Sequence, residues 1–120
     1  MNFIISANTD IGRSKNTNQD SLSVKVINTS IGKMVFAILC DGMGGLAKGE
    51  VASASVICAF DKWAKVELPY LCKNTLDENL IRTQWEKILV EQNYSIKNYG
   101  ALQGVRLGTT AVIILITGEK

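Results

Sequence analysis

Apolar and polar residues along the chain predict strands and helices in a mixed order. Residues 3–7 are a short apolar stretch typical of a strand, and residues 21–26 alternate polar and apolar side chains as a half-buried strand does. Turn-forming residues at 28–32 lead into a continuous apolar run at 34–40, which favours a strand covered on both faces and ending at Asp41. The sequence therefore predicts a β-hairpin early in the chain.

Two long helices are predicted next. Apolar residues recur at helical spacing over residues 48–66, and we expect this helix to stop before Pro69. Thr75 and Glu78 have the spacing of a capping box, and the helix that follows them is expected to run to Gly100. After a loop at 104–108, the branched apolar segment 109–117 predicts another buried strand. The predicted buried face of the second helix consists of Ile81, Trp85, Ile88, Leu89, Ile96 and Tyr99.

The composition agrees with one domain of the α/β or α+β class over residues 1–120. The chain is 47% hydrophobic and 20% charged, and its ten glycines suit a protein with tight turns between strands and helices. The formal net charge is only +2 and the basic residues are spread out, which gives no support for binding to nucleic acid or to a membrane surface. The longest apolar run, 111–116, is far shorter than the roughly 20 residues that span a bilayer.

Cysteine and histidine usage narrows the possible chemistry. Cys40, Cys58 and Cys72 are odd in number and lack the paired spacings of zinc sites, so they are interpreted as reduced structural thiols of a cytoplasmic protein. Histidine is absent, which removes the commonest general acid or base and the Ser-His and Cys-His nucleophile pairs. Any hydrolytic chemistry must therefore come from carboxylates and metals.

The most distinctive motif is the acid at the end of the apolar run, followed by glycines: Asp41-Gly42-Met43-Gly44-Gly45. A carboxylate held at a strand end beside flexible glycines suits a hard cation. Taken alone, the motif is more often a simple turn. Nucleotide binding is a minor alternative, because neither the phosphate-loop pattern nor the dinucleotide fingerprint is present.

A second polar segment precedes the hairpin and contains Arg13, Lys15 and Asp20. By itself it is a solvated loop. In order and spacing, however, the segments 18–20, 41–45, 49–53 and 108–111 together resemble the type 2C (PPM) family of metal-dependent protein serine/threonine phosphatases, in a bacterial form. The resemblance extends over nearly the whole chain.

The resemblance implies roles for individual residues. It implies that Asp41 bridges two Mn²⁺ or Mg²⁺ ions, that the Gly42 carbonyl ligates one of them, and that Asp20 acts through metal-bound water. Lys15 stands where the family usually has a phosphate-binding arginine, and Arg13 is the alternative for this role. A lysine binds phosphate through a single point charge, whereas an arginine guanidinium can make two parallel hydrogen bonds to it.

The resemblance also implies a fold and an activity. The implied fold is of the α+β class and is part of a four-layer α-β-β-α sandwich, incomplete at the C-terminal end. The implied activity is hydrolysis of phosphoserine and phosphothreonine in phosphorylated proteins by metal-activated water. No aspartate follows Asp77, so the family's later metal ligands are missing and activity of this chain alone is not expected. The alternative is a catalytically inactive remnant that binds partners or assembles with itself.

Self-assembly is also suggested by the strand predicted at 109–117. The sequence offers no obvious strand to pair with it, and its apolar side chains need cover. We therefore expect a homodimer or higher oligomer whose interface includes residues 112–116.

Overall fold

The computed structural model of the chain describes residues 2–8, 20–44, 49–73 and 75–117, with residues 2–8, Asp20 and Gly44 described by their backbone. Its elements follow one another as three strands, a helical middle and a last strand. The sequence-based class, α+β, is confirmed by this content.

The predicted hairpin is formed by β2 (Asp20–Thr29) and β3 (Gly32–Gly44), which pair in antiparallel fashion. Ser30 and Ile31 make the two-residue turn between them. Gly32 follows with a φ of 121°, a backbone conformation that residues with a side chain rarely adopt. The turn fixes the register of the hairpin, which runs from Thr29 opposite Gly32 to Asp20 opposite Asp41.

Two further strands complete one antiparallel sheet in the order β1-β4-β3-β2. β4 (Leu107–Thr117) lies between β3 and β1 (Asn2–Asn8) and pairs with both. The expectation that the 109–117 strand lacks pairing partners is therefore wrong. The N-terminal strand returns to pair with the last one, a long-range contact that no local pattern in the sequence indicates.

The first helical segment is longer than predicted. α1 (Gly49–Lys62) continues through the π-helical turn η2 (Trp63–Glu67) into α2 (Leu68–Leu71), and the Leu68 N–H donates to the Trp63 carbonyl across this wider turn. The prediction that the helix stops before Pro69 is wrong. Pro69 lies in the first turn of α2, directly after the π-helical turn, and this wider turn lets the helical segment continue past it.

α3 (Glu78–Gln103) also differs from its predicted ends. The side chain of Asp77 accepts hydrogen bonds from the backbone N–H groups of Asn79 and Leu80 at 3.0 and 3.3 Å, so Asp77 and not Thr75 is the N-cap. The helix passes through Gly100 and ends before Gly104, which takes a left-handed φ of 69°.

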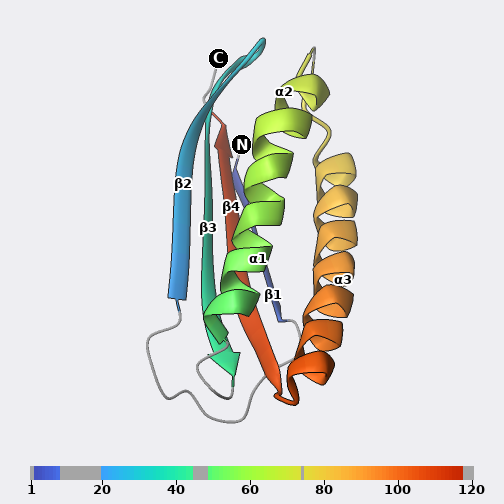
Figure 1. The fold of residues 1–120 in the computed structure, drawn as a ribbon. Helices are drawn as coiled ribbons and strands as arrows, with labels where there is room; N and C mark the ends of the chain where they lie inside the picture. Colours follow the sequence, from blue (N-terminus) through green and yellow to red (C-terminus); the bar gives the residue numbers. More distant parts are fainter. Residues whose placement is uncertain (1, 9–19, 45–48, 74, 118–120) are drawn as a thin grey trace.

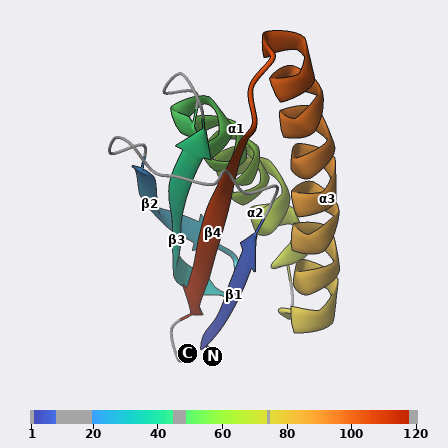
Figure 2. The same ribbon diagram turned by 90° about the horizontal axis from the view of Figure 1, so that it is seen from below.

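The core lies between the helices and one face of the sheet. Figures 1 and 2 show α1 and α3 side by side on the same side of the four strands. At the centre of this layer, Trp85 of α3 meets Phe36, Phe60 and Trp63, with ring centroids 5.6–6.2 Å apart and all three pairs edge-to-face. The helix face predicted to be buried is confirmed, with Ile81, Trp85 and Ile96 fully inside and the other three residues half-buried.

No described helix or strand covers the other face of the sheet, which we call the open face: Leu22, Val24 and Val26 of β2, Val35, Ala37 and Leu39 of β3, and Val112, Ile114 and Ile116 of β4. The prediction that residues 34–40 are covered on both faces is thus wrong within the described chain, since Leu39 is 45% exposed. The described residues make two layers, one of helices and one of strands, where the resemblance implied part of a four-layer sandwich.

Gly100 offers a test of the helix packing. A Cβ at this position would lie 2.7 Å from the Val105 carbonyl oxygen and 2.5 Å from Leu107 Cδ2, and the first of these is backbone that cannot move aside cheaply. Gly100→Ala should therefore lower the free energy of unfolding by about 1–3 kcal/mol, whereas alanine replacing an exposed helical glycine normally raises it.

Urea denaturation followed by circular dichroism measures this difference. Asn98→Ala, at an exposed position of the same helix, is the control and should be neutral or stabilising by about 0.5 kcal/mol. Equal stabilisation by both substitutions would contradict the close approach of α3 to β4.

Candidate functional site

Three polar positions come together at the end of the sheet where β2 begins, β3 ends and β4 begins, at the bottom of Figure 1. Asp41 is the register partner of Asp20 on one side and of Thr110 on the other. Directly opposed residues of antiparallel strands share one face of a sheet. Asp41 stands between Cys40 and Gly42, which are both buried towards the helices, so the three positions belong to the face that the helices leave uncovered.

The glycine-rich motif is part of this strand. β3 continues past Asp41 to Gly44, with Gly42 paired to Thr109 and Met43 paired to Gly108. The interpretation of Asp41-Gly42-Met43-Gly44 as a turn is therefore wrong, and so is the prediction that the strand ends at Asp41. Pairing to β4 holds the backbone on both sides of the carboxylate, which is the rigidity that a binding site requires.

The donor chemistry of these positions suits a hard dication. Opposed residues of an antiparallel pair have Cα atoms about 4.5–5.5 Å apart, and both positions carry a carboxylic acid, the kind of oxygen ligand that hard dications prefer. The number of donors is small, because Mg²⁺ and similar ions take about six oxygens. Among the residues that the structure describes, no group of three or more His, Cys, Asp or Glu could hold a metal ion. Asp20 and Asp41 are the type of residue that binds such an ion, but two carboxylates are too few to complete its coordination.

A buried polar layer lies behind the acids, on the helix side of the sheet. Ser53 of α1 is fully buried; its hydroxyl donates to the Glu50 carbonyl at 3.2 Å and lies 3.1 Å from the Ser21 hydroxyl of β2. Thr109 of β4 is equally buried and donates to the Thr110 carbonyl at 2.9 Å. The contact between Ser53 and Ser21 ties the start of α1 to β2, whereas the Thr109 bond stays within β4.

Cys40 belongs to the same layer and is chemically inert there. Burial raises the pKa of its thiol to about 12, and a hydrogen bond with Thr109 lowers that pKa by less than burial raises it. The thiol is therefore neutral at physiological pH and is no nucleophile, as the sequence predicted for a structural cysteine. Ser53 and Thr109 were given no role from the sequence, although both lie in the segments that carry the family resemblance.

The residues predicted to bind phosphate, Lys15 and its alternative Arg13, lie outside the described residues. Their role stays a prediction. The same holds for the metal-binding roles of Asp41, Gly42 and Asp20, of which the structure gives the placement on the sheet.

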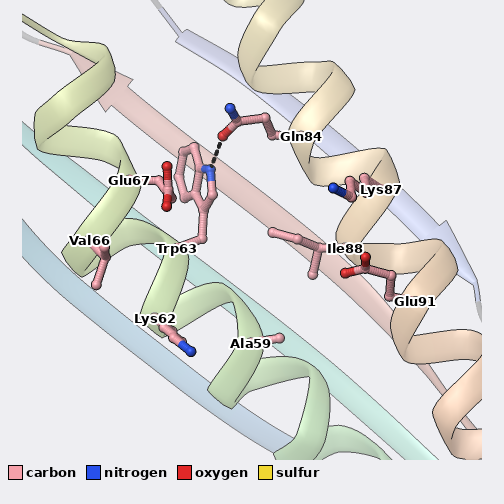
Figure 3. Close-up of a pocket in the computed structure, with 9 residues that line it drawn as sticks. All are labelled: Ala59, Lys62, Trp63, Val66, Glu67, Gln84, Lys87, Ile88 and Glu91. Carbon is pink, nitrogen blue, oxygen red and sulfur yellow. Dashed lines mark hydrogen bonds between the residues drawn. The ribbon is translucent and has the colours of Figure 1, made fainter.

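A separate groove lies on the helix side of the molecule, between α1 and α3 (Figure 3). It has a volume of about 440 Å³, and beside it the Trp63 indole N–H donates to the Gln84 side-chain oxygen at 2.7 Å. Its charged residues are of both signs, Lys62 and Lys87 with Glu67 and Glu91. The sheet separates this groove from the acids, so it takes no part in the candidate site.

Comparison with known proteins gives one informative likeness. No family model and no curated protein matches the chain. The solved structure of the S. agalactiae serine/threonine phosphatase is similar to it, with a TM-score of 0.57 and 27% identity over 97% of this chain. The chain spans 45% of the length of that phosphatase. The likeness supports a phosphatase-like fold over nearly the whole chain and does not extend to the metal or the activity.

Within the described ranges, no helix is long and apolar enough to cross a membrane.

Thiol reactivity provides a test of the buried layer. Cys58 is exposed on α1, whereas Cys40 and Cys72 are buried and burial raises the pKa of both thiols. At pH 8 an alkylating reagent should label Cys58 quickly, while Cys40 reacts only when the chain unfolds, because the thiolate is the reactive form.

Mass spectrometry of peptides from the native and urea-treated protein measures the labelling. The fully unfolded chain is the control and should be labelled at all three cysteines. Rapid labelling of Cys40 in the native protein would contradict the conclusion that its thiol is buried and neutral.

Proposed function

We propose that this chain is the N-terminal part of a Mn²⁺- or Mg²⁺-dependent protein serine/threonine phosphatase that acts on phosphorylated proteins in the cytoplasm. The observation that carries the proposal is the register of Asp20 opposite Asp41 on one face of the sheet end. It supports a cation site where the family resemblance expects one. The likeness to a solved serine/threonine phosphatase adds support at the level of the fold.

In this proposal Asp41 and the Gly42 carbonyl bind the metal directly, and Asp20 contributes through bound water. When bound, the ions would supply an acidified water and neutralise charge on the phosphoryl oxygens. Lys15, or Arg13 in its place, holds the phosphate as a cation. Met43 has no proton to give to the leaving group, so it does not serve as the acid.

The second candidate is a catalytically inactive phosphatase-like module that binds partners or assembles with itself. The small number of acids favours it, since no third His, Cys, Asp or Glu joins Asp20 and Asp41 within the described ranges. The two candidates differ in whether the acidic pair binds a metal at all.

Metal binding can be measured without catalysis. Titration with Mn²⁺ should broaden the amide signals of residues 41–43 and 109–110 selectively in the NMR spectrum, because a paramagnetic ion relaxes nearby nuclei. Asp41→Asn should weaken this effect at least about tenfold, given that loss of even an indirect metal partner costs 10–100-fold in affinity.

Asp77→Asn is the matched control, since it removes one negative charge while asparagine keeps the N-cap of α3. It should leave the Mn²⁺ titration unchanged. The absence of selective broadening in the unaltered protein would favour the inactive module over the proposed metal site.

Catalysis by the chain alone should be very weak. Towards a small aryl phosphate with millimolar Mn²⁺, we expect turnover far below the roughly 1 per second of ordinary enzymes, because Asp20 and Asp41 do not fill the coordination of two dications. Release of phosphate measures the rate. A rate near the ordinary range that Asp41→Asn abolishes would mean that a further group of this chain completes the site.

A further inference from the structure

Two hydrogen bonds join α3 to the continuous segment of α1 and η2 on the helix side of the molecule. The Trp63 indole N–H donates to the Gln84 side-chain oxygen at 2.7 Å, and the Ser55 hydroxyl donates to the Gln92 side-chain oxygen. The step from Ser55 to Trp63 on one helix is as long as the step from Gln92 back to Gln84 on the other. The two helices therefore run antiparallel and in step, and the stretch between the two bonds is about 12 Å long.

The groove between α1 and α3 lies over the middle of this stretch (Figure 3). Ala59 of α1 and Ile88 of α3 are both halfway between the two hydrogen bonds, so they stand level with each other. The side chain of Ala59 ends at its Cβ and leaves the α1 wall hollow opposite Ile88. Val66, in the same wall, is 56% exposed. The groove thus has an accessible apolar floor.

One wall of the groove contains the π-helical turn. Trp63 begins this turn, and Val66 and Glu67 within it line the groove. Single π-helical turns are rare and are frequently found at functional sites. The π-helical turn therefore distinguishes this groove from an ordinary space between two packed helices.

The charges of the groove follow a definite order along its length. Because the helices are in step, this order is Glu91, Lys87, Lys62 and Glu67. The rise of a helix separates the two lysines by about 3 Å along the axis and places each glutamate about 6–7 Å beyond the nearer lysine. Positive charge therefore stands at the centre of the groove and negative charge at both ends.

These four side chains are exposed and are not paired with one another. Within the described residues no ion pair joins any two of them, although Lys87 and Glu91 are one helical turn apart on α3. A ligand of one charge sign would meet as much repulsion as attraction, since two positive and two negative groups line the groove. The matching occupant carries both signs, negative at its centre and positive towards both ends.

We propose that the groove binds an amphipathic helix of a partner protein, with an apolar residue over Ala59 and Ile88. Residues on one face of a helix recur about every 5.4 Å, so an acid at the centre of that face meets the two lysines. A basic residue one turn before it and another one turn after it then meet Glu67 and Glu91. An extended strand suits the groove less, because helical walls offer no backbone partners for its N–H and C=O groups.

The groove stays accessible whatever covers the open face. α1 and α3 pack on one side of the sheet, and the open face is the other side. Helices are also the outer layers of the four-layer sandwich that the family resemblance implies, so a further sheet on the open face would leave the groove exposed. The proposal rests neither on the metal nor on phosphatase activity, and its failure would leave the proposed function standing.

Two synthetic helical peptides of about 20 residues, long enough to form a helix, test the proposal by isothermal titration calorimetry. The matching peptide carries lysine, glutamate and lysine on successive turns of one face, with a leucine beside the glutamate. The reversed peptide carries glutamate, lysine and glutamate there, and residues on the far face keep the two net charges equal. The matching peptide should bind at least about tenfold more tightly, and high salt should reduce the difference. Equal affinities, or no binding of the matching peptide, would overturn the proposal.

Charge reversal in the protein gives the second arm of the test. Lys62→Glu combined with Lys87→Glu should weaken binding of the matching peptide at least about tenfold, because attraction at the centre becomes repulsion. Lys97→Glu is the matched control, since Lys97 is exposed on α3 and does not line the groove, and it should change the affinity no more than about twofold. Undiminished binding to the double variant, with native circular dichroism, would contradict the proposed contact.

Filling the groove tests its shape independently of charge. Ala59→Leu should weaken binding of the matching peptide, because the longer side chain occupies the hollow opposite Ile88. Ala54→Leu, at an exposed position of α1 outside the groove, should leave the affinity unchanged. Equal effects of the two substitutions would place the peptide elsewhere.

NMR of the unaltered protein locates the peptide if a variant fails to fold. The matching peptide should shift the Trp63 indole N–H signal and leave the methyl signals of Leu22 and Val24 on the open face unchanged. Shifts on the open face without a change at Trp63 would refute the proposal. A peptide with alanine in place of both lysines should bind more weakly than the matching one, and equal affinity would refute the proposal as well, since the groove would then take any single acidic group.

Discussion

The register of β3 with β2 and β4 determines which side of the sheet every strand residue faces. Because side chains alternate along a strand, a slip of one residue would send Phe36 out of the core and Asp41 into it. Two features hold the register: the hairpin turn before Gly32, with its positive φ, and the packing of Phe36 against Trp63 and Trp85. The core and the candidate site are thus set by the same alignment.

The two faces of the sheet differ in what they contribute to stability. Full burial of a Val, Leu, Ile or Phe side chain stabilises by about 1.5–3 kcal/mol, and β3 and β4 each place such residues against α1 and α3. On the open face, side chains such as Leu22 and Ile116 remain 66% and 44% exposed and contribute only a part of this. The sheet therefore depends on the helix side for its stability, while β2 joins it mainly by backbone pairing and a few polar contacts to α1.

Local patterns in the sequence were enough to predict the strands, the hairpin and the two long helices, because each depends on periodicity and turn residues close in the chain. The ends of the helices were harder. Asp77 competes with Thr75 as a cap, and the π-helical turn at Trp63–Glu67 lets the chain pass Pro69 without a break. The position of β4 between β1 and β3 follows from pairing across more than a hundred residues, which no window of sequence contains.

For the candidate site, the sequence indicated the acids through a family resemblance but not their relation in space. Asp20 and Asp41 are 21 positions apart in the chain, and only the hairpin register shows that they are directly opposed. Ser53 and Thr109, which lie behind the acids on the helix side, are ordinary small polar residues, and only their burial distinguishes them.

The open face and the acids are physically coupled. Asp41 and Leu39 are two residues apart on the same face of β3, a distance of about 6.6–6.8 Å along the strand, so any layer that covers Leu39 also borders the carboxylate. Such a layer removes water from the acids and brings its own polar groups close to them. A cation held by Asp20 and Asp41 would then feel a lower local dielectric and a larger set of donors, and both changes strengthen its binding. A purely apolar layer without a cation would instead make two neighbouring carboxylates costly to keep ionised. The chemistry of this site therefore depends on what covers the open face as much as on the acids themselves.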